Sequence, residues 1–288
     1  DIAKAYATED PFTALSICAE ISSKVSVRDI EFECHIKIAE TTDTLTEKHS
    51  HLSTAKKLCG NSSKVKYARI ITLALSLAKS LFVSGNFEEG YAVCEEFPCA
   101  ETELLSLSYK FEGLKKIAGD DAASKELEIL IGVCDSSPNA TIIYQSDTYN
   151  SIWNEYVRRN LSKAAKQSAV NAVDTLLKVE DKLKNAHFDS SELYKILADN
   201  ISKQSYTIAI EYEGSSDYEH AIKYYDIAIK YDPANGTTAS RRVLCYQKHG
   251  LWKGQQLKQE VDTTLGLLTS IADRVTFLKT LVINGYED

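Results

Sequence analysis

The sequence contains no methionine and few of the residues that interrupt helices, with four prolines and twelve glycines among 288 residues. Because proline and glycine mark the turns of strand-rich folds, their scarcity favours long helices. The missing methionine, the initiator included, predicts that the chain begins at a processed or internal position. No signal peptide is expected to start at Asp1.

Long apolar runs are also missing, since no stretch approaches the roughly 18 consecutive apolar residues of a spanning helix. The sequence therefore predicts no membrane insertion. Basic residues are outnumbered, and the net charge is −8. Sequence-independent binding to nucleic acid needs clustered Lys and Arg, so no direct nucleic-acid binding is expected. With 44% hydrophobic and 26% charged residues, the composition is that of a foldable, soluble chain.

The common catalytic motifs are absent: there is no G-x-x-x-x-G-K, G-x-G-x-x-G, G-x-S-x-G or H-E-x-x-H. His49 and His51 could bind a metal weakly with His35, but a solvated helix start is the favoured interpretation. Cys94 and Cys99 flank two glutamates, and a packed helix end is favoured over redox chemistry. We therefore expect no enzyme, no metal site and no cofactor.

Seven scattered cysteines form no C-x-x-C pair, which favours small buried thiols in a reducing compartment. The expected location is intracellular, in the cytoplasm or nucleus. Five N-x-S/T sequons point weakly toward a secretory context. They lie at Asn61, Asn139, Asn160, Asn200 and Asn235.

Apolar residues at helical spacing recur along the whole chain, and two-residue alternation does not persist. The pattern predicts an all-α fold with helices over residues 11–21, 30–45, 52–58, 65–83, 87–97, 104–117, 122–133, 149–159, 161–179, 190–213, 217–235, 238–248 and 255–283, the last with an internal break. Residues 1–9 are expected to form a shortened first helix. Gly119 is expected to close one helix, and Asp120 or Asp121 to cap the next.

The domain prediction places an N-terminal helical-repeat half at residues 1–134 and a C-terminal half at residues 147–288, which ends in a capping helix. The stretch CDSSPNAT, from Cys134 to Thr141, is the most loop-like in the chain. Residues 135–146 are therefore a candidate joint.

A unit of 34 residues runs from Ser202 to Asn235 and contains small residues at fixed intervals. Small side chains at Ala209, Ala221 and Ala228 let two helices approach closely, while Tyr212 and Tyr225 fill the space beside them. Pro233 closes the unit. This unit resembles a tetratricopeptide repeat (TPR), although Ser205 stands where that family has a tryptophan.

Other segments match the repeat less completely. Residues 71–97 supply small and aromatic positions that include Ala78, Gly85 and Gly90. Residues 146–179 match with Trp153 at a position that is usually small, and with Asn160 at the turn between the two helices. Arg242 falls where the last unit needs a buried leucine. The segment IEFECHIKIAETTDTLTEK, residues 30–48, faintly resembles the small repeat-built subunit of the cohesin loader.

The TPR resemblance implies antiparallel helix pairs stacked as a right-handed superhelical solenoid, with a concave groove lined by the first helix of each pair. It also implies a non-enzymatic scaffold or adaptor that binds a protein or peptide segment in that groove. The register places these residues in the groove: Asn150, Asn154, Val157, Arg158, Lys203, Tyr206, Ile210, Glu213, Ser240, Leu244, Gln247 and Lys248.

Three alternatives remain beside this interpretation. The chain could be an obligate subunit of a larger trafficking or chromosome-associated complex. Binding of C-terminal carboxylates is disfavoured, because Tyr206 and Ile210 replace the amide and basic residues that this mode requires. Tyrosines along residues 206–231 could stack on single-stranded nucleic acid, but packing is expected to use Tyr212 and Tyr225. The oligomeric state is open.

Overall fold

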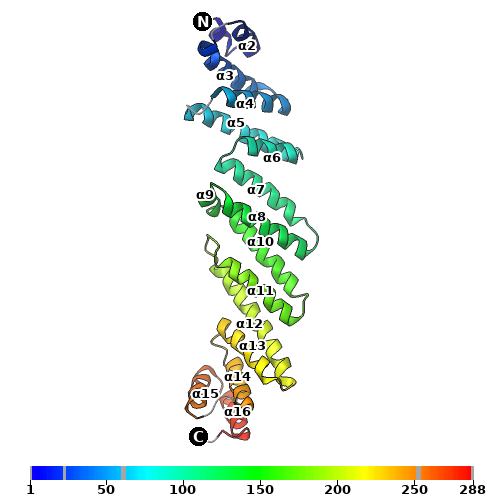
Figure 1. Cartoon of the computed structure of the whole chain (residues 1–288), viewed down its shortest axis with the longest axis vertical. Helices are drawn as coiled ribbons and strands as arrows, with labels where there is room; N and C mark the ends of the chain where they lie inside the picture. Colours follow the sequence, from blue (N-terminus) through cyan, green and yellow to red (C-terminus); the bar gives the residue numbers. More distant parts are fainter. Residues whose placement is uncertain (1, 22–23, 60–62, 251–253, 287–288) are drawn as a thin grey trace. The chain divides into compact units, whose positions relative to one another are not determined.

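The computed structural model describes residues 2–21, 24–59, 63–250 and 254–286, and the described part of the chain is all-α without a strand (Figure 1). Two compact units divide the chain. The first comprises Asp1–Lys116 and Leu130–Tyr149, and the second comprises Ile117–Ile129 and Asn150–Asp288. The sequon at Asn61 lies outside the described residues.

The helices of the first unit follow one another with short connections. They are α1 (Ile2–Tyr6), α2 (Pro11–Glu20), α3 (Lys24–Thr41), α4 (Leu45–Cys59), α5 (Lys64–Val83), α6 (Phe87–Glu96), α7 (Ala100–Lys115) and α9 (Ala140–Tyr144). Helix α8 (Asp120–Ser136) and helix α10 (Asp147–Ala164) contribute residues to both units. Asp10 caps α2 by accepting a hydrogen bond from the Thr13 N–H, which confirms the expected start.

The core of the first unit is built where α3, α4, α5 and α6 pack on their neighbours along the chain. Phe82 on α5 is 2% exposed and stacks on Tyr109 of α7 with ring centroids 4.2 Å apart. A Cβ at Gly90 would lie 2.7 Å from the Phe82 ring. The close approach of α5 and α6 therefore requires a glycine at this position.

The second unit holds α11 (Ala169–Leu183), α12 (Ser191–Gly214), α13 (Tyr218–Tyr231), α14 (Gly236–His249), α15 (Gln255–Leu267) and α16 (Ile271–Ile283). Each helix from α11 to α14 packs on the next, and α14 contacts both α15 and α16. The break expected inside residues 255–283 is confirmed at residues 268–270.

Helices α12 and α13 pack closely because small residues lie between them. Ala209 and Ala221 are completely buried, and Ala228 is 1% exposed. The Ser202 hydroxyl donates to the Ala228 carbonyl across the interface at 3.1 Å. Asp217 caps α13 by accepting from the His220 N–H. The packing roles predicted for these alanines and for Tyr225, which is also fully buried, are confirmed.

The turn expected at Asn160 is wrong, because Asn160 lies inside α10. Its side chain is 5% exposed, and its Nδ2 donates to the Tyr156 carbonyl of the same helix at 2.9 Å. This bond satisfies the buried amide without interrupting the helix. The chain turns at residues 165–168 instead, and Ser168 is the N-cap residue of α11.

The loop-like stretch CDSSPNAT is helical at both of its ends. Cys134, Asp135 and Ser136 end α8, and Ala140 begins the short helix α9 inside the candidate joint. Ile143 is 1% exposed, so α9 has a buried anchor in the first unit. A local run of Ser, Pro and Asn predicted a loop, but Ala140 and Thr141 begin a short helix in which Ile143 is buried.

Candidate protein-binding surface

The groove residues predicted on α12 lie on the side of the helix that has few buried residues. Lys203 has a side chain that is 71% exposed, and its Nζ pairs with Asp199 one turn earlier at 2.6 Å. Tyr206 and Ile210 are half-buried. The Tyr206 ring lies 6.0 Å from the Tyr225 ring, so its inner edge packs on α13 while its outer edge reaches solvent.

Glu213, at the end of α12, is the centre of a polar cluster with three residues of α13 and α14. Its carboxylate accepts from the Tyr225 hydroxyl at 2.7 Å and from Arg241 Nη1 at 2.9 Å. Lys248 Nζ lies 3.8 Å from the same carboxylate. The structure therefore brings together Glu213 and Lys248, which the sequence placed on separate repeats.

Burial and the Glu213 carboxylate together raise the pKa of Tyr225, which stays protonated and donates at neutral pH. Burial disfavours the charged form of Arg241, but its bonds with Tyr225 and Glu213 raise the pKa of the guanidinium. Burial also raises the pKa of the neighbouring Cys245 thiol to about 12. The cluster is thus an ion pair with a hydroxyl donor, and it contains no reactive nucleophile.

The predicted residues of α14 differ in how far they reach solvent. Lys248 is exposed, whereas Ser240 is half-buried and donates to the Thr237 carbonyl at 2.8 Å. Leu244 packs beside the apolar cluster of α14, α15 and α16. Gln247 Nε2 donates to the Leu281 carbonyl of α16 at 2.9 Å. Leu244 and Gln247 therefore have part of their surface covered by the terminal helices.

On α10, Asn154 and Arg158 are exposed, but Val157 is 1% exposed and the expectation that it lines a groove is wrong. Tyr156 and Val157 are adjacent in the sequence, and both are buried. The buried side of α10 is therefore wider than the narrow apolar stripe of a coiled-coil helix. Asn154 Nδ2 donates to the Asn150 carbonyl at 2.7 Å. The half-buried Asn150 has its side-chain oxygen sequestered from solvent.

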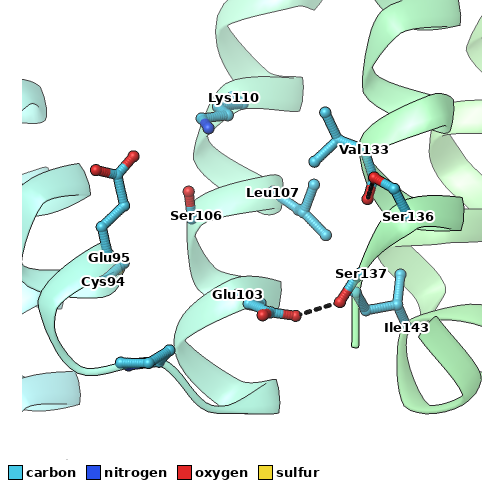
Figure 2. Close-up of a pocket in the computed structure, with 11 residues that line it drawn as sticks. Cys94, Glu95, Glu103, Ser106, Leu107, Lys110, Val133, Ser136, Ser137 and Ile143 are labelled. Atoms are coloured by element: carbon cyan, nitrogen blue, oxygen red, sulfur yellow. Dashed lines mark hydrogen bonds between the residues drawn. The ribbon is translucent and has the colours of Figure 1, made fainter. Parts of the chain in front are cut away.

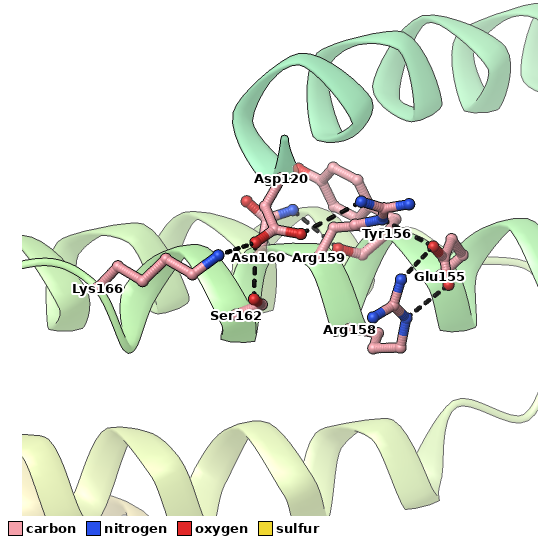
Figure 3. A network of polar contacts seen from close by, with 8 residues as sticks. All are labelled: Asp120, Glu155, Tyr156, Arg158, Arg159, Asn160, Ser162 and Lys166. Carbon is pink, nitrogen blue, oxygen red and sulfur yellow. Dashed lines mark hydrogen bonds and ion pairs between the residues drawn. The ribbon is translucent and has the colours of Figure 1, made fainter. Parts of the chain in front are cut away.

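A polar network on α8 and α10 was missed by the sequence analysis, which assigned Asp120 to helix capping alone (Figure 3). The Asp120 carboxylate accepts from Ser162 at 2.7 Å and pairs with Arg159 at 3.3 Å and Lys166 at 2.6 Å. Glu155 pairs with Arg159 at 2.8 Å. Hydrogen bonds from Lys166 and Ser162 lower the pKa of Asp120.

A pocket of about 280 Å³ lies in the first unit, between α6, α7, the end of α8 and α9 (Figure 2). Leu107 and Ile143 are among its apolar lining residues, and Glu95 and Lys110 are among its charged ones. The Glu103 carboxylate accepts from Ser137 at 2.5 Å. Burial raises the pKa of Cys94 to about 11, so its thiol stays protonated at neutral pH. The lining fits an apolar side chain with polar groups around it.

His49 and His51 lie within α4 and are partly buried, so the expected solvated helix start is wrong. His51 Nδ1 lies 2.7 Å from His35 Nδ1, and His49 Nε2 pairs with Glu96 at 2.8 Å. Burial, with a smaller effect of His51, lowers the pKa of His35 to about 4. Among the described residues no group of three or more His, Cys, Asp or Glu side chains is placed to hold a metal ion.

No family model matches the sequence, and no curated protein matches it. The repeat resemblance consequently depends on the residues of the chain itself. Within the described residues no helix is both long enough and apolar enough to cross a bilayer.

Proposed function

We propose that the chain is a non-enzymatic scaffold of the TPR type that binds an extended segment of a partner protein. In this proposal the helix pairs form a right-handed superhelical solenoid, and the first helices of the pairs, α10, α12 and α14, supply the binding face. The observation that carries the proposal is the α12–α13 pair. Its interior is closed by alanines, while Lys203 is exposed on α12 and Tyr206 is half-buried beside it.

The chemistry of the face fits a peptide with acidic and apolar residues. Lys203 and Arg158 have side chains that are 71% and 59% exposed, and each is paired with a carboxylate on its own helix. The Lys203–Asp199 pair is exposed on both sides and contributes little free energy, about 0.2–1 kcal/mol, so a partner's carboxylate can replace Asp199. Tyr206, three residues after Lys203 on α12, offers an aromatic surface.

Seven free cysteines, six of them buried, favour a reducing environment, and we assign the scaffold to the cytoplasm or nucleus. Two of the sequons support this assignment. Asn160 is buried in α10, and Asn200 lies inside α12, where its Nδ2 donates to the Ile196 carbonyl at 2.8 Å. A glycan at either position would oppose the helix packing.

The proposal is tested by selecting peptides from a random library on the purified chain and measuring their affinity for charge-reversal variants. Lys203→Glu and Arg158→Glu are expected to weaken binding about tenfold each, equivalent to about 1.4 kcal/mol. Lys178→Glu on α11 is the matched control, because Lys178 is exposed on the second helix of a pair. If the selected peptides bind all three variants with the same affinity, α10 and α12 do not form the binding face.

The alternative, an obligate subunit of a larger assembly, is favoured by a different observation. Large aliphatic side chains are exposed on the last helix, α16. Exposed apolar patches of this kind are typical of surfaces that another protein covers. Aggregation of the chain expressed alone, with recovery on coexpression of a partner, is the outcome that this alternative predicts.

A further inference from the structure

The terminal helix α16 has an exposed aliphatic stripe. Ile271, Val275, Leu278 and Val282 are 78%, 44%, 37% and 63% exposed. Their spacing of four, three and four residues places them on one side of the helix. This is the spacing of the a and d positions along which two helices meet in a coiled coil.

Another side of α16 is already packed on its own unit. Phe277 and Leu281 are 4% and 0% exposed, and they join the apolar cluster that includes Val243 of α14. Gln247 of α14 also donates to the Leu281 carbonyl. The helix is therefore held by one face, and the stripe is a second apolar face that this packing does not use.

Both ends of α16 are capped, so the helix is formed before any partner binds. The Ser270 hydroxyl oxygen accepts from the Asp273 N–H at 3.4 Å. At the other end Gly285 has φ +88°, the Tyr286 N–H donates to the Leu281 carbonyl, and the Gly285 N–H donates to the Val282 carbonyl. These two bonds form a Schellman motif, which fixes the helix end. A preformed helix lowers the entropic cost of binding.

We propose that this stripe binds one amphipathic helix of a partner protein, with aliphatic residues at its own a and d positions and acidic residues beside them. The charges that flank the stripe select this partner. With Ile271 and Leu278 at d and Val275 and Val282 at a, Arg274 occupies a g position and Lys279 an e position. Both are exposed and basic. Acidic e and g residues on the partner pair with them across the seam.

The same two residues oppose pairing of α16 with a second copy of itself. In a parallel pair each g residue faces the e residue five positions later on the other helix, so Arg274 meets Lys279 of the second copy. In an antiparallel pair g faces g and e faces e, so Arg274 meets Arg274 and Lys279 meets Lys279. Both arrangements therefore place basic residues opposite each other, and their repulsion weakens self-pairing. A partner helix with acidic residues at these positions avoids this repulsion.

The stripe is separate from the binding face proposed for α10, α12 and α14, and the inference does not depend on it. Helix α16 is 13 residues long, about 20 Å at 1.5 Å per residue. It offers about three helical turns of contact. Such a contact buries less surface area than a standard protein interface, so micromolar affinity is expected.

The test uses two labelled peptides, each three heptads long with Ile at a and Leu at d. One has Glu at every e and g position and the other has Lys. Like charges at e and g keep each peptide from pairing with itself. Fluorescence anisotropy with the purified chain measures the affinity, and we expect the Glu peptide to bind about tenfold more tightly than the Lys peptide.

Three variants sharpen the test. Val275→Asp is expected to abolish binding, whereas Thr276→Asp, which adds the same charge at an exposed position off the stripe, leaves it unchanged. Lys279→Glu is expected to reduce the preference for the Glu peptide. Lys178→Glu on α11, an exposed position outside both faces, should bind both peptides like the unmodified chain.

Several results would overturn the proposal: no binding of the Glu peptide, equal binding of the two peptides, or unchanged binding by Val275→Asp. A dimer of the chain in sedimentation velocity that Val275→Asp dissociates would overturn it as well, because a second copy would then be the occupant. None of these outcomes bears on the peptides selected on α10, α12 and α14, so failure here and failure of the proposed function are distinguishable.

Discussion

Arg159 and Asp120 form an ion pair at 3.3 Å although 39 residues separate them in the sequence, and their side chains are only 11% and 12% exposed. The pair joins the first turn of α8 to α10 within the second unit. Glu155 and Lys166 extend it on either side. This network, together with the alanine contacts of α12 and α13, holds the helices that carry the proposed binding face.

Replacement of Arg159 by methionine should destabilise the second unit. The change keeps most of the apolar stem but leaves Asp120 and Glu155 without the guanidinium, and breaking a buried ion pair costs about 3–5 kcal/mol. Urea unfolding measures the effect. Lys125→Met, at an exposed pair with Asp121, is the control and should change stability by less than about 1 kcal/mol. Equal effects of the two variants would show that the Arg159 pair has no special role.

Acid should weaken the same network below about pH 4. Because the pKa of Asp120 is lowered from its ordinary value of 3.8, the folded state binds fewer protons than the unfolded chain there. The contribution is full above this value and is lost as the pH falls below it. The stability difference between the unmodified chain and Asp120→Asn, measured by urea unfolding, should therefore shrink as the pH falls. A constant difference down to about pH 3 would contradict this assignment.

The His35–His51 pair should give the first unit a different pH dependence. The folded-state pKa of His35 is lowered from 6.5 to about 4, mainly by burial. The stabilising effect of a neutral His35 is therefore lost as the pH falls from about 6.5 toward 4. His35→Leu should flatten the unfolding free energy over this range, and Lys37→Leu on the same helix should not. If both variants keep the slope of the unmodified chain, the slope has another origin.

Enlarging Ala221 should separate α12 from α13. The alanine is fully buried between the helices, so Ala221→Leu is expected to destabilise the unit by about 1–3 kcal/mol through overpacking. Lys223→Leu, on an exposed position of α13, should remain within about 0.5 kcal/mol of the unmodified chain. Chemical denaturation compares them. A neutral effect of Ala221→Leu would mean that the helices do not need to approach closely.

Local patterns predicted most of the fold because the helices carry their own signals. The apolar spacing predicted helices over residues 11–21 and 217–235, and α2 and α13 lie within these ranges. The error at Asn160 arose because polar residues at a helix interior resemble a turn until their hydrogen bonds are known. The local run of Ser, Pro and Asn likewise did not indicate α9, in which Ile143 is buried.

The polar contacts of the candidate site were harder to predict, because they join distant residues. Glu213, Tyr225 and Arg241 lie on three helices, and no local pattern relates them. No local pattern relates Asp120 to Arg159 either, because 39 residues separate them. The stripe on α16 was present in the sequence at i, i+4, i+7 and i+11, but only the structure shows that Phe277 and Leu281, and not the stripe, face α14.

The central claim, that α12 contributes to a peptide-binding face, is tested most directly by photocrosslinking. A benzophenone amino acid replaces Tyr206 on α12 or, as the control, Lys178 on α11, and each chain is irradiated with the same library-selected peptide. The account predicts a crosslink from position 206 and none from position 178. Crosslinking from position 178 alone would contradict the account, because the peptide would then lie on the second helices of the pairs.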